Sequence, residues 1–278
     1  MSMGKLYICG TPIGNLEDVS IRLLKTLRKV DFIVCEDTRR TIKLLNHYKI
    51  KKPLISYHEH SKKEKEDYIL GLLMEGNEIA LVSDAGMPGI SDPGENLVKR
   101  AIDAEIPVEV IPGPTAAVSA LAVSGIDASS FVFVGFLPNK KGKRREEILK
   151  LKEEKRTMVF YESPHRLIET LKDMQEIWGE DRRIAVAREL TKVYEEVIRA
   201  SLKEAVSYFE LNPPKGEFTL VIEGDKTEKE ASLEEILREV KELIESGINR
   251  NEAFKIKARE YKLRKSDLYK SFIEKYDM

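Results

Sequence analysis

The chain has 278 residues, of which 42% are hydrophobic and 34% charged, and its formal net charge is −1. This length suits two domains rather than one, with enough apolar material for packed cores beneath a charged surface. No apolar run reaches the roughly 18 residues of a membrane helix, and the N-terminal sequence MSMGKLYICG lacks the layout of a signal peptide, so we expect a cytoplasmic protein without a membrane partner.

The first part of the chain alternates short apolar runs with segments whose apolar residues recur at helical spacing. The expected strands are residues 6–9, 32–35, 79–83 and 108–111. The expected helices are residues 18–30, 38–48, 61–75 and 93–104. Such alternation predicts a mainly parallel sheet covered by helices, and we assign residues 1–134 to this N-terminal α/β domain.

The cysteines and histidines do not indicate a metal centre. Cys9 and Cys35 lie inside expected strands, where a thiol is usually a small buried hydrophobe rather than a disulfide partner or a zinc ligand. His58 and His60 flank Glu59, but no neighbouring Cys or further His completes a ligand set. We therefore predict no metal site.

A basic segment rich in turn-forming residues, FLPNKKGKRR at residues 136–145, leads into a charged helix expected to end near Arg156. A second set of elements follows this helix. The expected strands are residues 158–161, 184–187, 196–200 and 218–222, and the expected helices are residues 164–177 and 202–209. Several of their connections are short enough for hairpins, so we predict a second α/β domain over residues 135–225.

The last part of the chain is helical in pattern. Residues 226–230 are polar and linker-like, and Ser232 with Glu235 forms a capping-box pattern at the start of a helix. The expected helices are residues 232–246, 251–261 and 266–276. The last two share the outline of a helix–turn–helix unit, so we assign residues 226–278 to a helix-turn-helix-like tail.

Basic residues gather in two places despite the balanced total charge. They outnumber acidic residues nine to four over residues 139–156, and nine to five over residues 248–278. Defined basic surfaces suit contact with the phosphates of a nucleic acid. The alternatives are ordinary solvated helical faces and, for the tail, packing against the rest of the chain.

Three loops rich in glycine and proline each follow an expected strand. They are GTPIGN at residues 10–15, SDAGMPGISDPG at residues 83–94 and PGPTAA at residues 112–117. Ligands of open α/β sheets bind beyond the carboxyl ends of the strands, and glycines let a ligand approach the backbone. We interpret the second loop as a ligand loop in which Asp84 accepts hydrogen bonds, while Asp92 caps the helix that Pro93 opens. An ordinary structural turn is the alternative for the first and second loops, and close helix–sheet packing is the alternative for the third.

Charged residues follow two expected strands of the second domain. They lie in YESPHR at residues 161–166 and in ARELTK at residues 187–192. Loops at strand ends commonly carry catalytic groups. A salt-bridge network between the two segments is the alternative interpretation.

In combination and in this order, the motifs resemble the tetrapyrrole methylase family, the class III methyltransferases. They are TPIGNLEDVS (11–20), CEDTRRT (35–41), SYHEH (56–60), SDAGMPGISDPG (83–94), PGPTAA (112–117), GFLP (135–138), YESPHR (161–166) and AREL with the following Lys and Glu pair (187–196). The resemblance spans residues 5–224, and within the family it is strongest to a branch that 2′-O-methylates a cytidine in the decoding region of 16S ribosomal RNA. It implies two α/β domains with the cofactor cleft between them, plus a small C-terminal helical extension.

The resemblance also implies the cofactor, S-adenosylmethionine, and the partner, 16S rRNA within the small ribosomal subunit, bound by a homodimer. Carried over by motif position, the cofactor-binding residues are Ile13, Asp84, Ala85, Gly86, Met87, Thr115, Ala116, Tyr161 and Ala187. Residues 217–219 are a weaker candidate for contact with the adenosine. Met87 stands where threonine is more familiar in the family.

Methyl transfer to a ribose hydroxyl is an in-line displacement, in which the protein positions the acceptor and helps to remove its proton. Candidate proton acceptors at strand ends are Glu36, Asp37, Glu162 and Glu189. Candidate ligands of phosphate or of the acceptor are Arg39, Arg40, Arg166, Arg188 and Lys192. We place Glu189 first as proton acceptor, with Glu162, Arg188 and Lys192 as the other catalytic residues; an ion pair with Arg188 or Lys192 is the alternative role of Glu189.

Two other functions fit parts of the same sequence. A small-molecule methyltransferase acting on a tetrapyrrole would share the fold and the cofactor, but the basic segments and the tail argue against it. A non-catalytic RNA-binding factor would explain the basic segments, but not the complete set of cofactor loops.

Overall fold

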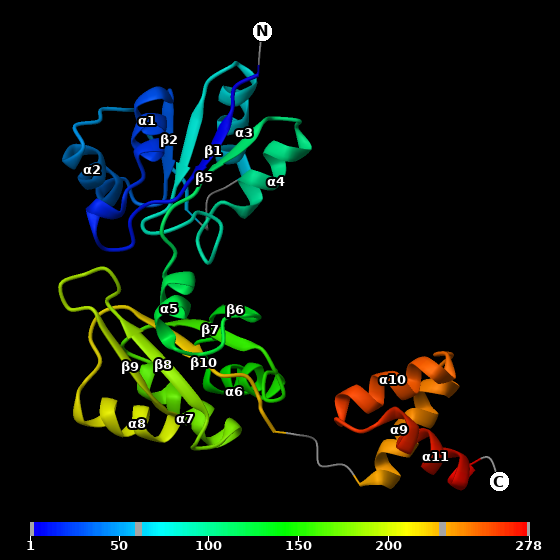
Figure 1. Cartoon of the computed structure of the whole chain (residues 1–278). Helices are drawn as coiled ribbons and strands as arrows, with labels where there is room; N and C mark the ends of the chain where they lie inside the picture. Colours follow the sequence, from blue (N-terminus) through cyan, green and yellow to red (C-terminus); the bar gives the residue numbers. More distant parts are fainter. Residues whose placement is uncertain (1–2, 59–62, 228–231, 277–278) are drawn as a thin grey trace. The chain divides into compact units, whose positions relative to one another are not determined.

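The computed structural model describes residues 3–58, 63–227 and 232–276, and the chain forms two compact units, Met1–Asp225 and Lys226–Met278 (Figure 1). The predicted α/β fold with a helical C-terminal extension is confirmed. No helix among the described residues is long and apolar enough to cross a membrane. Glu59 and His60 of the SYHEH motif, and the expected helix start at residue 61, lie outside the described residues.

A five-stranded sheet forms the centre of the first domain. Its strands, in the spatial order β3-β2-β4-β1-β5, are β1 (Leu6–Cys9), β2 (Phe32–Cys35), β3 (Leu54–Ser56), β4 (Ile79–Val82) and β5 (Val108–Ile111). All neighbours run parallel, as the alternating pattern predicts. Every residue of β1 and β4 is buried, because a parallel sheet covered on both faces reads as continuous apolar runs. The short edge strand β3 was missed by the sequence analysis.

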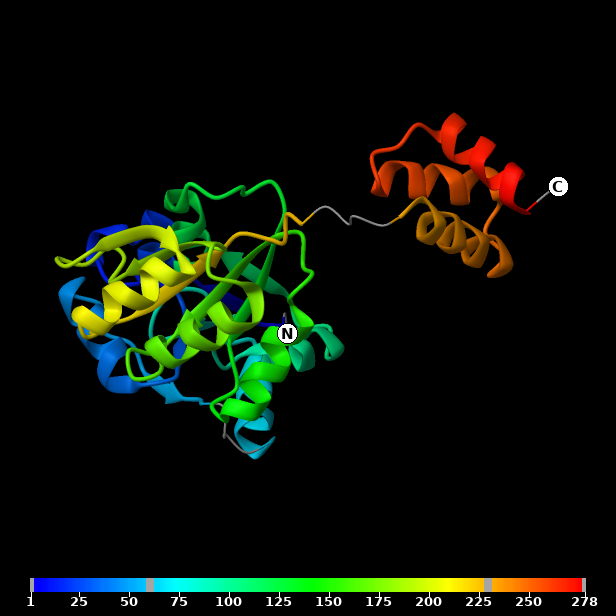
Figure 2. The ribbon, with the colours of Figure 1, turned by 90° about the horizontal axis from the view of Figure 1, so that it is seen from below.

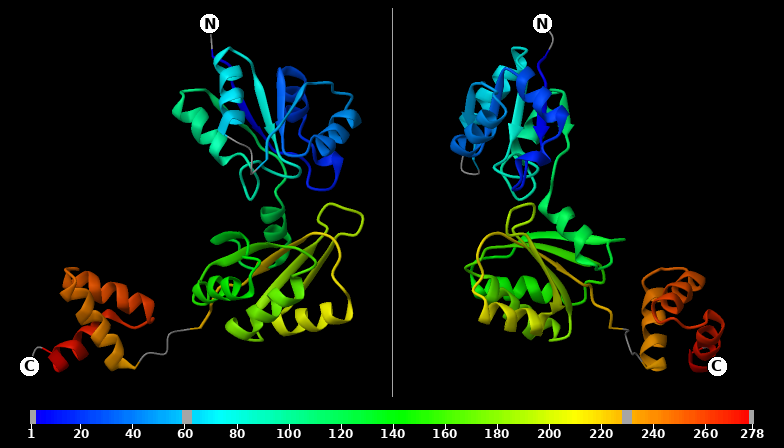
Figure 3. Two further views of the ribbon diagram at one scale, coloured as in Figure 1. Left: turned by 180° about the vertical axis from the view of Figure 1, so that it is seen from behind. Right: turned by 60° about the vertical axis from the view of Figure 1, so that its left-hand side comes forward.

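Helices cover both faces of this sheet (Figure 3). The helices are η1 (Leu16–Asp18), α1 (Ile21–Lys29), α2 (Thr38–His47), α3 (Lys63–Met74) and α4 (Glu95–Asp103). Leu6 and Ile8 face the layer that contains α3 and α4, whereas Tyr7 and Cys9 face the layer that contains α1 and α2. The loops at the carboxyl ends of the strands are left to build a site.

A second five-stranded sheet forms the centre of the second domain. Its strands, in the spatial order β6-β7-β10-β8-β9, are β6 (Phe131–Phe136), β7 (Thr157–Glu162), β8 (Arg183–Arg188), β9 (Glu196–Ser201) and β10 (Phe218–Ile222). Only β6 and β7 run parallel, and the other pairs are antiparallel. One face packs on α6 (Lys141–Lys150), α7 (Leu167–Trp178) and α8 (Leu202–Leu211). The charged helix α6 thus ends before the expected Arg156.

Helix α5 (Ala116–Ser124) covers the opposite face of the second sheet (Figure 1). Its Ala120 and Leu121 pack in one cluster with Val159 of β7 and Val221 of β10. The domain boundary expected after residue 134 therefore falls inside β6, and α5, which lies within the expected first domain, packs on the second sheet. A helix of small residues can lie this close to a sheet because few side-chain atoms separate them.

The tail unit consists of α9 (Leu233–Glu245), α10 (Arg250–Glu260) and α11 (Lys265–Tyr276) (Figure 2). The predicted capping box is present, with Ser232 and Glu235 bonding to each other's backbone N–H groups. Val240, Phe254 and Phe272 belong to a core that contains residues of the tail alone. The three predicted helices are confirmed within a residue or two.

Candidate functional site

A cavity of about 430 Å³ lies at the carboxyl ends of the first-domain strands, with further walls from the second domain. Its lining comes from the loops after β1, β2 and β4, the start of α5, the ends of β6, β7 and β8, and the start of β10. This volume is within the range of small-molecule sites. All nine residues expected to bind the cofactor line this one cavity: Ile13, Asp84, Ala85, Gly86, Met87, Thr115, Ala116, Tyr161 and Ala187.

The three glycine- and proline-rich loops are joined backbone to backbone. Thr11 and Gly86 exchange two hydrogen bonds, with N···O distances of 2.9 and 3.1 Å. Gly86 has a φ of 82°, which favours glycine. A Cβ added to Gly10 would lie 2.7 Å from the Cα of Gly113, so these two backbones leave no room for a side chain. The glycines therefore hold the loops together as one rim of the cavity.

The second domain contributes an aromatic wall. The Tyr161 hydroxyl accepts a hydrogen bond from the backbone N–H of Ala117 at 3.3 Å. The rings of Phe133 and Phe136 lie 5.1 and 5.5 Å from the Tyr161 ring, and Phe136 also lines the cavity. Burial raises the pKa of Tyr161, so its hydroxyl stays protonated at neutral pH. Phe136 was missed because β6 itself was not predicted.

Asp84 connects the cavity to the start of α2. Its Oδ1 accepts a hydrogen bond from the backbone N–H of Asp37 at 3.1 Å, and its Oδ2 lies 3.4 Å from Nε of Arg40. Asp84 and Arg40 both line the cavity. The Arg40 guanidinium is mostly exposed, and this ion pair uses only part of it. Its other N–H donors can therefore bind an anionic or polar ligand.

Asp92 also lines the cavity, and the expectation that it caps a helix is wrong. Helix α4 starts only at Glu95, with Gly94 as its N-cap and no side-chain cap. The pKa of Asp92 is raised to about 6, mainly by burial and also by repulsion from Glu36 and Asp84. A hydrogen bond with Ser83 acts in the opposite direction and lowers it. A carboxyl group with such a pKa exchanges protons close to neutral pH.

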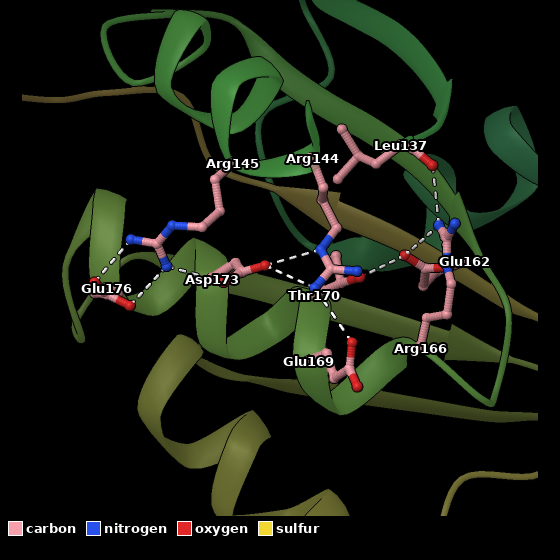
Figure 4. Close-up of polar contacts among 9 residues, drawn as sticks. All are labelled: Leu137, Arg144, Arg145, Glu162, Arg166, Glu169, Thr170, Asp173 and Glu176. Carbon is pink, nitrogen blue, oxygen red and sulfur yellow. Dashed lines mark hydrogen bonds and ion pairs between the residues drawn. The ribbon is translucent and has the colours of Figure 1, made fainter. Parts of the chain in front are cut away.

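Glu162 reaches the cavity wall, but its carboxylate is engaged on the protein side (Figure 4). It accepts hydrogen bonds from Arg166, from the Thr170 hydroxyl at 2.6 Å and from the backbone N–H of Ser163 at 2.7 Å. Arg166 also donates to the Leu137 carbonyl at 3.0 Å. The Glu162–Arg166 ion pair therefore connects the GFLP segment to the YESPHR loop. The buried carboxylate of Glu162 thus positions these two segments.

Glu189 lies outside the cavity lining and forms the ion pair that was the alternative to a catalytic role. Its Oε1 lies 2.9 Å from Nζ of Lys192 and accepts the backbone N–H of Glu217 at 2.9 Å. Burial alone would raise the pKa of Glu189, but these two bonds outweigh it and the pKa is lowered. A carboxylate with a lowered pKa is a weaker base.

Of the other charged candidates, some line the cavity and others form hydrogen bonds within the protein away from it. Arg188 and Lys192 do not line the cavity; Arg188 donates to the Lys215 carbonyl at 2.8 Å. Asp37 caps α2 by accepting from the backbone N–H of Arg39. Glu36 and residues 217–219 do line it. No group of metal-ligating side chains occurs among the residues that the structure describes.

Comparisons with known proteins agree with this architecture. Residues 5–206 match the family model of the Tetrapyrrole (Corrin/Porphyrin) Methylases. A "Ribosomal RNA small subunit methyltransferase I" of Thermotoga maritima is 56% identical over 80% of this chain and 99% of its own length. A protein of that name from Synechocystis sp. is 47% identical over 98% of both chains, and one from Bacillus subtilis is 45% identical over 97% of this chain and 94% of its own.

Solved structures with the same fold are more distant in sequence. The uroporphyrin-III-C-methyltransferase of Thermus thermophilus has a TM-score of 0.57 at 20% identity. The superposition covers 79% of this chain and 94% of that structure's chain. The methyltransferase CobJ has a TM-score of 0.61 at 18% identity, with 82% and 97% covered. At these identities the likeness establishes the fold alone.

Proposed function

The chain belongs to the tetrapyrrole methylase family, and we propose that it methylates small-subunit ribosomal RNA. The observation that carries the proposal is 47% identity over 98% of both chains to a protein named for this reaction. S-adenosylmethionine is the methyl donor. We further propose, from the motifs, that the target is the 2′-hydroxyl of a cytidine in the decoding region of 16S rRNA, and that the reaction takes place in the cytoplasm.

The cavity suits S-adenosylmethionine in size and chemistry. The close approach of Gly10 and Gly113 and the left-handed Gly86 make a rim of bare backbone, against which a ligand can lie. Ile13 and Ala187 supply apolar surface for an adenine ring, and Asp84 supplies a carboxylate for hydroxyl or amino groups. When bound, the cofactor supplies a methyl group that its sulfonium already activates.

The protein's own part in the reaction is to hold the acceptor and to remove its proton. Positioning a hydroxyl in line with the methyl group replaces a bimolecular encounter by an intramolecular step. Arg40 at the cavity rim is suited to a phosphate of the acceptor RNA. A neutral Tyr161 is suited to donate or accept a hydrogen bond at the wall.

We propose that the tail supports binding of the RNA. Within the described residues, the exposed side chains of Lys255, Arg259 and Arg264 form no ion pair, so they can contact phosphates. Folded RNA is recognised largely through phosphates and shape, which a basic helical pair can follow. We also propose a homodimer, as the family resemblance implies; light scattering on the purified protein tests it.

Methyl transfer to three acceptors tests the function. With tritiated S-adenosylmethionine, we expect label in small ribosomal subunits or in naked 16S rRNA, and none in a precorrin. Label in the precorrin alone would refute the RNA substrate. Mass spectrometry of the labelled RNA then identifies the nucleotide, and a methyl group on a base instead of a ribose would refute 2′-O-transfer.

A further inference from the structure

We propose that Asp92 is the group that takes the proton from the acceptor hydroxyl. The inference rests on the proposed methyl transfer to a hydroxyl, and Asp92 is the residue that the local sequence predicts to be a helix cap. It stands on the position of Asp92 in the cavity and on the contacts that occupy the competing carboxylates.

Two of the four expected proton acceptors are excluded by their partners. Glu162 is bonded to Arg166, Thr170 and a backbone N–H, so accepting a further proton would break a buried ion pair. Glu189 is held by Lys192 and does not line the cavity. Both carboxylates stabilise the loops that carry them.

The first-domain carboxylates are divided in the same way. Asp37 caps α2 and does not line the cavity. Asp84 lines it, but one of its oxygens accepts a hydrogen bond from the Asp37 backbone and the other lies 3.4 Å from Nε of Arg40. Glu36 and Asp92 remain as carboxylates in the wall, and they repel each other.

The surroundings of Asp92 suit a proton acceptor. Glu36 follows β2 and Asp84 follows β4, and the negative charges of both act on the Asp92 carboxylate. The Asp92 carboxylate in turn raises the pKa of Tyr161, at the end of β7. Burial and the two negative neighbours raise the pKa of Asp92 to about 6. A base is most effective when its pKa lies just below the working pH, because it is then both ionised and strong.

The step is balanced in atoms and electrons. As the acceptor oxygen bonds to the methyl carbon, the methyl–sulfur bond breaks and its electron pair stays on sulfur. The hydroxyl proton moves to the Asp92 carboxylate, which later releases it to water. Since the reaction requires ionised Asp92, the rate falls as the pH drops below about 6.

The variant Asp92→Asn removes the base with almost no change in size. We expect kcat on ribosomal RNA to fall about 10²- to 10⁴-fold. The cofactor affinity of the variant, measured by calorimetry, should equal that of the wild type. The acidic limb of the pH–rate profile disappears. In the protein without RNA, ¹³C NMR of the aspartates loses one resonance that titrates near pH 6. Asp103→Asn, exposed near the end of α4, controls for the removal of one carboxylate.

A second variant separates catalysis from a structural role. Glu36→Gln removes one negative neighbour, so the pKa of Asp92 should decrease and the acidic limb should shift to lower pH. An Asp92→Asn protein that keeps its rate within about threefold overturns the proposal, as does one that loses rate and cofactor affinity in parallel. Failure of the proposed function looks different, because the wild type itself would then label no ribosomal RNA.

Discussion

A buried ion pair in the body of the chain, Met1–Asp225, contrasts with exposed basic side chains in the tail, Lys226–Met278. In the body, Arg144 is 1% exposed and lies 2.8 Å from Asp173. In the tail, the exposed Lys255 and Arg259 of α10 have no ion-pair partner among the described residues. Buried pairs fix a structure, whereas exposed unpaired charges are available to a partner.

The Thermotoga maritima relative sharpens this contrast. It is matched over 99% of its own length but over only 80% of this chain, so it is shorter than this chain by about as many residues as the tail contains. It carries the same name as relatives that match nearly the full chain. We therefore expect the chemistry to depend on the body and the tail to contribute affinity for RNA.

The largest expected effect is on the stability of the body. Arg144→Met leaves Asp173 as an inadequately compensated buried charge, and breaking such a pair costs about 3–5 kcal/mol. The neighbouring Arg145 also bonds Asp173, but it is partly exposed, so Arg145→Met should cost about 1 kcal/mol or less. Urea unfolding of both variants measures the difference. If both variants lose the same free energy of unfolding, burial of the arginine does not decide how much its ion pair with Asp173 stabilises the fold.

The next effect is on the cofactor site. In Gly113→Ala, the new Cβ would lie 2.6 Å from the Gly10 carbonyl oxygen, so the loops must separate. Overpacking costs about 1–3 kcal/mol, and we expect cofactor affinity to fall about tenfold or more by calorimetry. Gly71→Ala is the control, because its Cβ meets nothing within 4 Å and alanine favours helix α3. Unchanged cofactor affinity in Gly113→Ala would show that the close contact between Gly10 and Gly113 is not needed for cofactor binding.

Deletion of residues 226–278 tests the division of labour directly. Because all cavity-lining residues are in the body, we expect the cofactor affinity to stay unchanged. The KM for small subunits should rise about tenfold or more, since several RNA phosphates would then have no basic side chain to neutralise them. A truncated protein with the full-length KM would show that the tail does not hold RNA.

The smallest effect concerns three exposed basic side chains of the tail. In the triple variant Lys255→Glu, Arg259→Glu, Arg264→Glu, we expect the salt dependence of RNA binding to become shallower, by about 0.7–0.9 in the log–log slope for each phosphate that is no longer neutralised. Lys99→Glu, at an exposed position on α4 of the body, is the control for one such charge reversal outside the tail, so it is compared with the change per substitution in the triple variant. A slope that changes equally in both proteins would contradict a specific role of the tail.

Much of the fold could be predicted because its apolar patterns are strong. The runs LYIC and IALV are buried throughout, and the tail helices carry their own capping box and apolar stripe. Strands β3 and β6 could not be predicted in this way. Strand β3 has three residues, and β6 is a half-exposed edge strand with an irregularity near Gly135, so neither shows a clear period.

The sequence by itself determined which loops build the cavity, because glycines and prolines that follow a strand impose their backbone geometry locally. Only the tertiary structure decided what each carboxylate does. Glu189 is engaged by Lys192 and the Glu217 backbone, while Asp92 is surrounded by residues from separate strand ends. Burial and neighbouring charge set the proton affinity of a side chain, and both depend on segments far apart in the chain.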